Sequence, residues 1–185
     1  MTRRMTAIAL ALVAACLTMP PTGAAPAQGA NPVIVMRTQK GTVEIELFQA
    51  DAPKSVAHIL DLVKDNFYRG LRFHRVEASL AQFGDPGTRD MSRIDYWGRG
   101  GSGHPIGVAE ISRKYTHQRG TVALAHSGSA AASDSQLYIM KRASPSLDGK
   151  FTIVGRVTTG MDVVDTIVKT DRILNITVKG AVPAF

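Results

Sequence analysis

The sequence predicts a mainly β domain in which antiparallel strands close into a barrel and two helices cover its ends. Three observations support this fold class. Many short runs are rich in β-branched and aromatic residues, only two segments have the spacing of an amphipathic helix, and strands and helices do not alternate. The 185 residues and the hydrophobic content of 44% suit one domain with a real core, and they exclude a disordered or membrane-filling chain.

The first predicted elements of this domain are a hairpin and a helix. Strand-like runs at 32–38 and 41–48 are joined by a Gln-Lys-Gly turn signal, and the second run alternates apolar and polar residues. Asp51 is expected to accept amide hydrogen bonds at the N-cap of the helix, with Pro53 in the first turn. The helix is expected to end near Asn66. Its buried face has spacings of three and four and comprises Val56, Ile59, Leu60, Val63 and Phe67.

The remaining strands are short and are separated by loops. They are expected at residues 71–76, 80–83, 121–125, 136–140, 152–157 and 173–179. A second short helix starts at Gly160 and buries Met161, Val164 and Ile167. Residues 84–107 are rich in Gly, Arg, Asp and Ser and form a connection too long to be a plain one, so this ordered loop is expected to have a function.

The N-terminal segment has the pattern of a secretory signal. The basic start MTRR is followed by an apolar run at 5–19 that is short for a bilayer span, and then by small residues. Residues 25–27, Ala-Pro-Ala, match the cleavage pattern, which assigns 1–27 to a signal peptide. The remaining chain divides into a linker at 28–31, the domain at 32–180 and a tail at 181–185.

The same segment also resembles a bacterial lipobox, Val-Ala-Ala-Cys, ending at Cys16. In that alternative Cys16 is lipidated and anchors the domain to the bacterial envelope. Simple cleavage instead predicts a periplasmic or secreted protein without membrane attachment. Because Cys16 is the only cysteine, cleavage after Ala27 leaves no disulfide and no thiol chemistry.

Charge and common motifs exclude several classes of function. The formal net charge is +7, but the basic residues are scattered, so we expect no binding to nucleic acid. We also expect a monomer. The five histidines lack an H-x-x-x-H metal spacing, and no G-x-S-x-G elbow is present. The glycine-rich run at 98–103 lacks the Lys-Ser/Thr pair of a phosphate loop, which indicates a loop with unusual backbone angles.

Six motifs occur in one characteristic order along the chain. They are FYRGLRFHRV at 67–76, QFGDP at 82–86, GRGGSG at 98–103, HQRGTVALA at 117–125, SQLYI at 135–139 and LDGKFTIVGRVTTGMDVVD at 147–165. Together they resemble the cyclophilin-type peptidyl-prolyl cis-trans isomerases, as an exported bacterial member. The resemblance covers 32–180 and implies an eight-stranded antiparallel barrel capped by two helices. It also implies that proline-containing unfolded or folding polypeptides are the partners and that no cofactor or metal is needed.

The resemblance makes Arg75, in the FHR motif, the expected catalytic residue. Rotation about the bond before proline is slow because the nitrogen lone pair is delocalised into the carbonyl, with a barrier of about 18–20 kcal/mol. In the twisted transition state the lone pair is localised on nitrogen, and a guanidinium donor helps only at that moment. Arginine suits this role because it stays charged and its planar fork is preorganised.

The resemblance also implies a set of substrate-binding residues. Gln82 is expected to hold the substrate backbone, Gln136 to frame the groove, and His126 to replace an asparagine that bonds the peptide. The apolar pocket for the proline ring is expected to comprise Leu80, Tyr138, Leu147 and Phe151.

The chain departs from the family pattern near this pocket. Residues 76–81, VEASLA, are one residue shorter than the common spacing, and Ser146 stands where some members carry tryptophan. Phe83 replaces a usual glycine and is a candidate to refill part of the pocket. The inserted RDMSRIDYWGRG at 89–100 is a candidate to widen or cover the groove. These departures leave two hypotheses: an active isomerase that retains Arg75, or a weakly active or inactive module that binds or chaperones proline-containing peptides.

Overall fold

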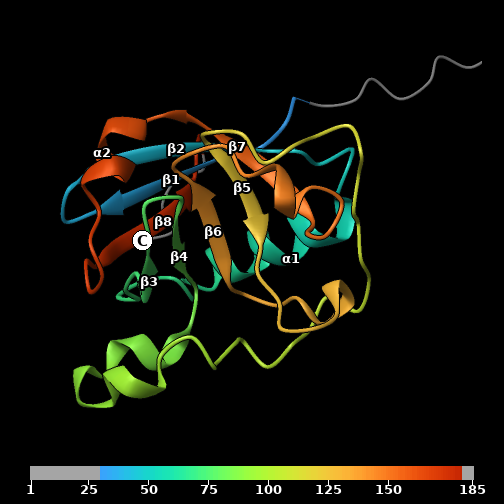
Figure 1. Ribbon diagram of the computed structural model, residues 1–185. Coiled ribbons are helices and arrows are strands. Elements are labelled where there is room, and N and C mark those ends of the chain that lie inside the picture. Colours follow the sequence, from blue (N-terminus) through green and yellow to red (C-terminus); the bar gives the residue numbers. More distant parts are fainter. Residues whose placement is uncertain (1–29, 181–185) are drawn as a thin grey trace, which may run out of the picture.

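The computed structural model describes residues 30–180, and the predicted mainly β class is confirmed. Eight antiparallel strands form one curled sheet in the order β3-β4-β6-β5-β7-β2-β1-β8 (Figure 1). Their bounds are β1 Val33–Thr38, β2 Gly41–Leu47, β3 Arg75–Val76, β4 Leu80–Phe83, β5 Thr121–Leu124, β6 Leu137–Met140, β7 Ile153–Thr159 and β8 Ile173–Val178. The expected signal peptide, Cys16 and the tail at 181–185 lie outside the described residues.

The barrel is only half-closed, which corrects the expectation of full closure. The strand ladder has two edges, because β3 and β8 do not pair with each other in the described sheet. Backbone contacts outside the regular ladder connect the segment before β3 with the start of β8: Gly70 N–H donates to Ile173 O at 2.9 Å, and Phe73 N–H donates to Asp171 O at 3.0 Å. Main-chain groups at the edges therefore find partners without a regular ladder.

The central strands β4, β5 and β6 are buried on both faces. Successive side chains along a strand point to opposite faces, so each strand contributes to two clusters. The main core lies inside the curled sheet and takes Ala81 and Phe83 from β4, and Leu137 and Ile139 from β6. A smaller apolar cluster lies on the other face. Its buried members are Phe48, Leu80, Ala123, Tyr138, Met140 and Ile153.

Helix α1, Pro53–Lys64, has the predicted proline in its first turn but a different cap from the one expected. The N-cap residue is Ala52, and the Glu110 carboxylate accepts from the amides of Lys54 and Ser55 at 3.0 and 2.8 Å. Asp51 instead accepts from the Tyr115 hydroxyl at 2.7 Å. The cap is thus supplied by a residue more than 50 positions away, which local sequence patterns do not reveal.

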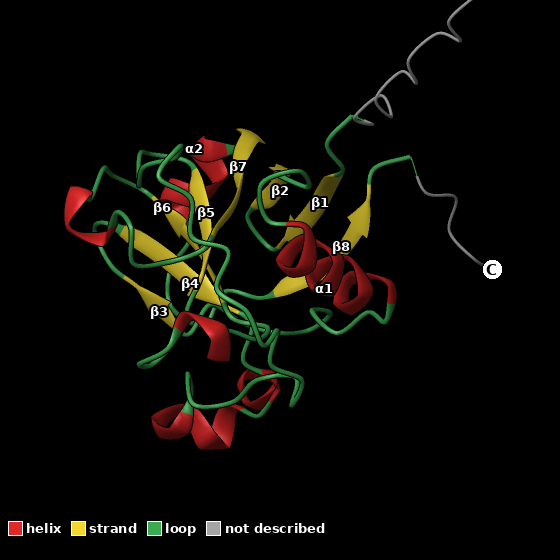
Figure 2. Cartoon of the chain, turned by 90° about the vertical axis from the view of Figure 1, so that its right-hand side faces the viewer, coloured by secondary structure: helices red, strands yellow, loops and turns green. Residues whose placement is uncertain are grey.

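The two α-helices lie at different ends of the sheet (Figures 1 and 2). Helix α2, Met161–Thr166, follows β7, and its Val163 side chain packs against Gly41 in the β1–β2 turn. Helix α1 follows the opposite end of β2 and packs near β8. Val56, Ile59 and Val63 are buried as predicted, whereas Leu60 and Phe67 are partly buried against the same core. No helix among residues 30–180 is long and apolar enough to cross a membrane.

Two segments between the strands differ from a simple reading of the sequence. Only Arg75 and Val76 of the run expected at 71–76 form a regular strand. The long loop at 84–107 contains two short 3-10 helices, η1 Pro86–Arg89 and η2 Met91–Tyr96, which project beyond the sheet (Figures 1 and 2). Gly98 and Gly103 have φ of 90° and 88°, so the predicted unusual backbone angles are confirmed.

Candidate functional site

A row of residues crosses four neighbouring strands on the outer face of the sheet. Arg75 on β3 lies directly opposite Gln82 on β4, Gln82 lies opposite Tyr138 on β6, and Tyr138 lies opposite Ala123 on β5. Residues directly opposite one another in antiparallel strands project from the same face. The shorter 76–81 segment therefore keeps Arg75 and Gln82 together, because Glu77 N–H donates to Leu80 O and closes a tight β3–β4 connection.

The polar end of this row is a hydrogen-bonded chain of side chains. Arg75 Nη1 donates to Gln82 Oε1 at 3.4 Å, and Gln82 Nε2 donates to Gln136 Oε1 at 2.8 Å. Arg75 Nε also donates to Glu77 Oε1 at 2.7 Å in a pair that is about half exposed. Among the contacts of residues 30–180, Arg75 Nη2 has no acceptor. Two guanidinium nitrogens are thus held while the third is available to a bound molecule.

The apolar end of the row brings together the four residues expected to line the proline pocket. Leu80 and Tyr138 are buried members of the outer cluster, and Leu147 and Phe151 pack against it. The Phe151 ring meets Tyr138 edge to face, with ring centroids 5.7 Å apart. These residues come from β4, β6 and the segment that precedes β7, so the fold assembles one apolar surface from distant parts of the chain.

Phe83 does not belong to this surface, and the hypothesis that it refills the pocket is wrong. Its side chain is fully buried in the main core, where it meets Phe73 and Tyr68 edge to face at 5.3 and 5.9 Å. Strand alternation explains the result, because Gln82 faces the groove and its neighbour must therefore face inward.

His126 lies in the groove, but its ring nitrogens are not presented to a peptide. Nε2 contacts Lys150 O at 3.1 Å, and Nδ1 is buried without a partner among the described residues. The ring stacks at a tilt on Phe151, with centroids 4.6 Å apart. His126 thus extends the aromatic wall of the groove.

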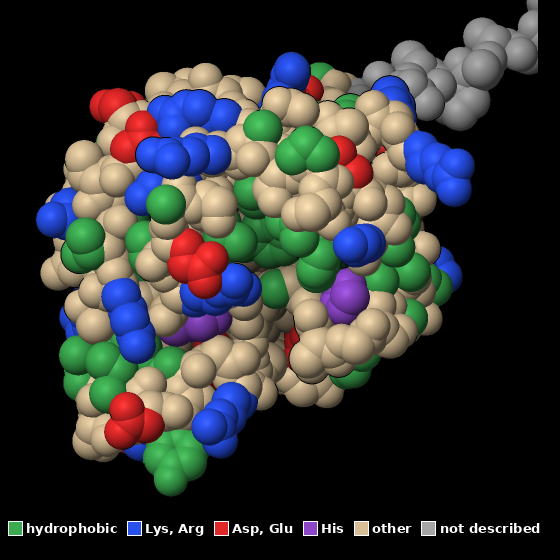
Figure 3. Space-filling model, viewed as in Figure 1, with side chains coloured by type: hydrophobic (Ala, Val, Ile, Leu, Met, Phe, Trp, Pro, Cys, Tyr) green, Lys and Arg blue, Asp and Glu red, His purple; other side chains and the backbone are tan. Residues whose placement is uncertain are grey.

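A groove of about 760 Å³ runs beside the polar end of the row. Figure 3 shows hydrophobic side chains gathered near the centre of this face, next to a hollow in the surface. Arg75, Gln82, His126 and Gln136 all line the groove. The other lining residues are His74, Trp97, Gly98, Arg99, Gly100, Gly101, Gly103, Pro105, Ala125, Ser127, Ala132 and Asp134.

The 84–107 loop supplies much of this lining, including Trp97, Arg99 and Pro105. The Trp97 indole donates to Asp90 O at 3.1 Å, which ties the ring to its own loop. The insertion at 89–100 thus borders the groove, in keeping with its prediction as a segment that widens or covers the groove.

The buried Asp85 carboxylate and the partly buried Gln136 amide hold the loop against the sheet. Asp85 accepts from the amides of Gly87 and Gly98 at 2.7 and 2.5 Å, and Gln136 Nε2 donates to the carbonyls of Gly98 and Gly100 at 2.9 and 2.7 Å. A side chain at Gly100 would clash with the Asp85 carboxylate. Gln136 therefore links the loop to the Arg75–Gln82 pair.

His74 lies beneath Gly98, and it is not the hydrogen-bonded structural histidine that a buried imidazole would suggest. It is 8% exposed, and neither ring nitrogen has a partner among residues 30–180. Burial lowers the pKa of His74, an effect that the nearby Asp85 carboxylate partly opposes. The described residues contain no group of three or more His, Cys, Asp or Glu side chains placed to hold a metal ion.

Comparisons with known proteins agree with this architecture. Residues 33–181 match the family model for cyclophilin type peptidyl-prolyl cis-trans isomerases. A probable peptidyl-prolyl cis-trans isomerase of Brucella suis is 38% identical over 159 residues, covering 83% of this chain and 81% of its own. A peptidyl-prolyl cis-trans isomerase of Helicobacter pylori is 38% identical over 142 residues, covering 75% of this chain and 81% of its own.

Solved structures show the same fold. A cyclophilin type peptidyl-prolyl cis-trans isomerase of Cryptosporidium parvum superposes with a TM-score of 0.72 at 22% identity, covering 82% of this chain and 99% of its own. A second crystal structure of that protein, in the presence of the dipeptide Ala-Pro, has a TM-score of 0.70. On the strength of the family model and the bacterial relatives, this chain belongs to the family of cyclophilin-type peptidyl-prolyl cis-trans isomerases.

Proposed function

We propose that this protein accelerates cis/trans rotation of peptide bonds that precede proline in extracytoplasmic polypeptides, with Arg75 stabilising the twisted transition state. The observation that carries the proposal is the row of facing residues: a guanidinium with one unpartnered nitrogen lies next to Gln82 and beside an apolar surface. This combination places a fixed cation where a proline ring can be held, which is what the reaction requires.

The chemistry follows from the change in the prolyl nitrogen during rotation. In the planar ground state its lone pair is shared with the carbonyl, and rotation localises it. A donor directed at that nitrogen is therefore stronger in the transition state than in the ground state. Arg75 can supply this donor through Nη2, because Glu77 and Gln82 hold the other two nitrogens in place. No covalent bond is broken, so the reaction needs neither a nucleophile nor a cofactor.

The outer apolar cluster and the remaining polar residues of the groove would hold the substrate. The Leu80, Tyr138, Leu147 and Phe151 surface suits a proline ring by its apolar character, and Gln82 can hydrogen-bond the substrate backbone. Gln136 connects Gln82 to the 84–107 loop through hydrogen bonds, while the His126 ring extends the aromatic wall beside Phe151. The crystal structure of the Cryptosporidium parvum relative in the presence of the dipeptide Ala-Pro supports short proline-containing peptides as ligands.

The test is an NMR exchange measurement on an Ala-Pro peptide, comparing the wild type with Arg75→Ala. We expect the wild type to speed exchange, and the variant to lose at least about tenfold, or 1.4 kcal/mol of transition-state stabilisation, while still binding the peptide. Arg156→Ala is the matched control, because Arg156 is also exposed on a strand and its Nε pairs with Glu46 at 2.8 Å.

The possible outcomes separate the two functional hypotheses. Equal exchange rates for wild type and Arg75→Ala would contradict the assigned role of Arg75. If neither protein speeds exchange although both bind the peptide, the chain is a proline-peptide binding module, because uniform binding does not accelerate rotation.

We propose an extracytoplasmic location from the signal-like pattern at 1–27. Mass spectrometry of the protein purified from its source cell is the direct test. A mature N-terminus at Gln28 would support secretion with simple cleavage, and a lipidated N-terminal Cys16 would support envelope anchoring. An unprocessed chain confined to the cytoplasmic fraction would contradict export.

A further inference from the structure

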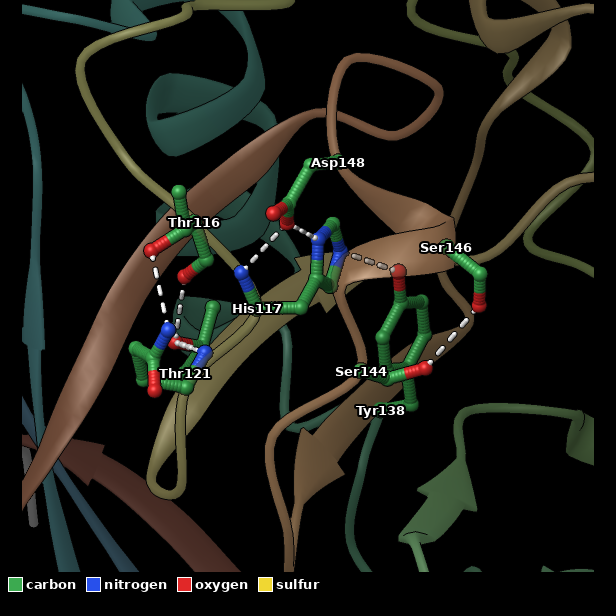
Figure 4. Close-up of polar contacts among 8 residues, drawn as sticks. Thr116, His117, Thr121, Tyr138, Ser144, Ser146 and Asp148 are labelled. Carbon is green, nitrogen blue, oxygen red and sulfur yellow. Dashed lines mark hydrogen bonds and ion pairs between the residues drawn. The ribbon is translucent and has the colours of Figure 1, made fainter.

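A chain of hydrogen bonds runs from the buried Tyr138 hydroxyl at the apolar end of the site to the partly exposed Asp148 carboxylate (Figure 4). The Tyr138 hydroxyl contacts His117 Nε2 at 2.9 Å, and His117 Nδ1 contacts Asp148 Oδ1 at 2.8 Å. The same Asp148 oxygen accepts from the His117 backbone amide at 2.7 Å. These residues come from β6, from the segment before β5 and from the turn after Leu147. We refer to Tyr138, His117 and Asp148 as the tyrosine anchor.

The chemistry of the donor and acceptor groups sets the direction of each bond. An ionised carboxylate can only accept, so a neutral His117 ring carries its proton on Nδ1. Nε2 is then an acceptor, and the Tyr138 hydroxyl must donate to it. The hydrogen bonds from His117 lower the pKa of Asp148, in keeping with an ionised carboxylate in this chain.

The direction of the last bond matters for the pocket. Tyr138 is 3% exposed, and its ring carries the apolar surface opposite Gln82. A phenol buried without an acceptor is costly, so an unanchored hydroxyl would turn toward water or substrate in the groove. While His117 Nε2 accepts a hydrogen bond from the Tyr138 hydroxyl, that hydroxyl is held away from the groove and the Tyr138 ring meets Phe151 edge to face.

The anchor also fixes the neighbouring wall. Asp148 directly follows Leu147, which packs on the same apolar cluster, and Phe151 lies three residues further along. The His117 ring is fully buried between Tyr138 and Phe151, with centroids at 6.0 and 6.2 Å. One carboxylate therefore connects the floor of the pocket with the turn that supplies its wall.

We propose that His117 and Asp148 are positioning residues of the isomerase site, which act by holding the Tyr138 ring as the floor of the proline pocket. This inference rests on the proposed function, since it assigns the pocket to a proline ring. It adds two residues that do not line the groove and have no direct part in the chemistry.

The first experiment measures whether the effect of His117 passes through the Tyr138 hydroxyl. His117→Leu is made in the wild type and in the Tyr138→Phe background, and kcat/KM for an Ala-Pro peptide is measured by NMR exchange. We expect a loss of more than about tenfold with tyrosine present and less than about threefold in the phenylalanine background, as for strongly coupled neighbours. Equal losses in both backgrounds would overturn the proposal, because a purely structural role does not need the hydroxyl.

Asp148→Asn provides a gentler variant if His117→Leu fails to fold. Asparagine keeps a carbonyl acceptor for the His117 amide but weakens its hold on the protonated Nδ1. We expect the loss of kcat/KM again to require the Tyr138 hydroxyl, with about threefold or more in its presence and no significant change without it. A loss of the same size in both backgrounds would contradict the anchor.

A second readout does not depend on isomerase activity. Long-range ¹⁵N NMR of the His117 ring is expected to show protonated Nδ1 and bare Nε2 at neutral pH, and Asp148→Asn should weaken this preference. A ring protonated on Nε2 in the wild type would overturn the assignment. If the wild type does not speed exchange at all, the proposed function fails, while the tautomer and the peptide affinities of the same variants still test the anchor.

Discussion

At the scale of single residues, Glu77 orients the guanidinium of Arg75 at the groove. Glu77 holds Nε at 2.7 Å, and both side chains are about half exposed. Exposed pairs of this kind contribute little to stability, so the contact is more important for orientation than for folding. Glu77 belongs to the shortened segment at 76–81, so this segment supplies a support for the Arg75 side chain.

Glu77→Gln tests this role. We expect the free energy of unfolding to change by less than about 0.5 kcal/mol, because the pair is exposed. The isomerase rate should fall by about three- to tenfold, because a looser guanidinium is less often aligned with the prolyl nitrogen. Chemical denaturation and NMR exchange measure the two quantities. Glu46→Gln, which breaks the comparable pair with Arg156, should leave the rate unchanged, and a rise in rate for Glu77→Gln would show that Glu77 restrains Arg75 unproductively.

Single residues also show where sequence reasoning succeeds and fails. Leu80, Tyr138, Leu147 and Phe151 were predicted to share one surface from their places in the motifs, and the structure brings them together. Phe83 does not share this surface, because strand alternation turns it to the face opposite Gln82, and its aromatic type gives no signal of that direction. The tyrosine anchor could not be predicted, because its three members come from separate segments and only folding brings them together.

At the scale of elements, helix α1 is capped from a distance. Glu110 accepts from two amides at its N-terminus, whereas Asp51, the residue expected from the sequence, binds Tyr115 and Lys114. We expect Glu110→Gln to lower the free energy of unfolding by about 1 kcal/mol, as for loss of an N-terminal cap. Amide hydrogen exchange should increase at Ser55 in this variant. The same local increase in Asp51→Asn, with none in Glu110→Gln, would restore Asp51 as the cap.

The 84–107 loop depends on Asp85 in a similar way. Its two oxygens accept from the amides of Gly87 and Gly98, and the residue is buried. In Asp85→Asn the new side-chain NH₂ group faces one of these two backbone N–H donors. This should lower the free energy of unfolding by about 1–3 kcal/mol and loosen the loop. Thermal unfolding and peptide affinity measure the effect. Asp90→Asn is the control, since Asp90 makes a similar turn contact with Ser92 but is exposed, and equal destabilisation by both would contradict the importance of burial.

Regular elements were easier to predict than their connections. The hairpin of β1 and β2 and strand β4 lie within one residue of the expected positions, because alternation of apolar and polar residues is a local property. The run at 71–76 was expected as one strand but is mostly irregular, since its backbone groups contact residues 171–173 instead of a regular ladder. Such partners follow from how the sheet curls and not from residue type.

At the scale of the whole molecule, the curled sheet separates two apolar clusters with different tasks. The inner cluster stabilises the fold, and the outer one provides the surface beside Arg75 and Gln82. Strands that are buried on both faces lack a clear polar face, so a sequence alone does not show which side is the site. The motif resemblance supplied that assignment, whereas incomplete closure between β3 and β8 became visible only in the structure.

The stability of the whole molecule should depend on pH through His74. Burial lowers the pKa of this side chain below its usual value of 6.5, so the unfolded chain binds the proton more readily than the folded one. Stability is therefore fully present above about pH 6.5 and declines as the pH falls below it, by up to about 1.4 kcal/mol per pH unit. Carboxyl groups with lowered pKa values, such as Asp148 and Asp165, lose their contribution only at lower pH.

Replacing His74 separates these contributions. We expect the free energy of unfolding of the wild type, measured by chemical denaturation, to fall between pH 7 and pH 5. His74→Leu should flatten this slope by the contribution of about one proton, because it removes the group that binds a proton on unfolding. His104→Leu is the matched control, because His104 is an exposed histidine in the neighbouring loop and should leave the slope as it is. An unchanged slope in His74→Leu would mean that the folded protein accommodates a protonated His74, for example by moving the Gly98 loop that covers it.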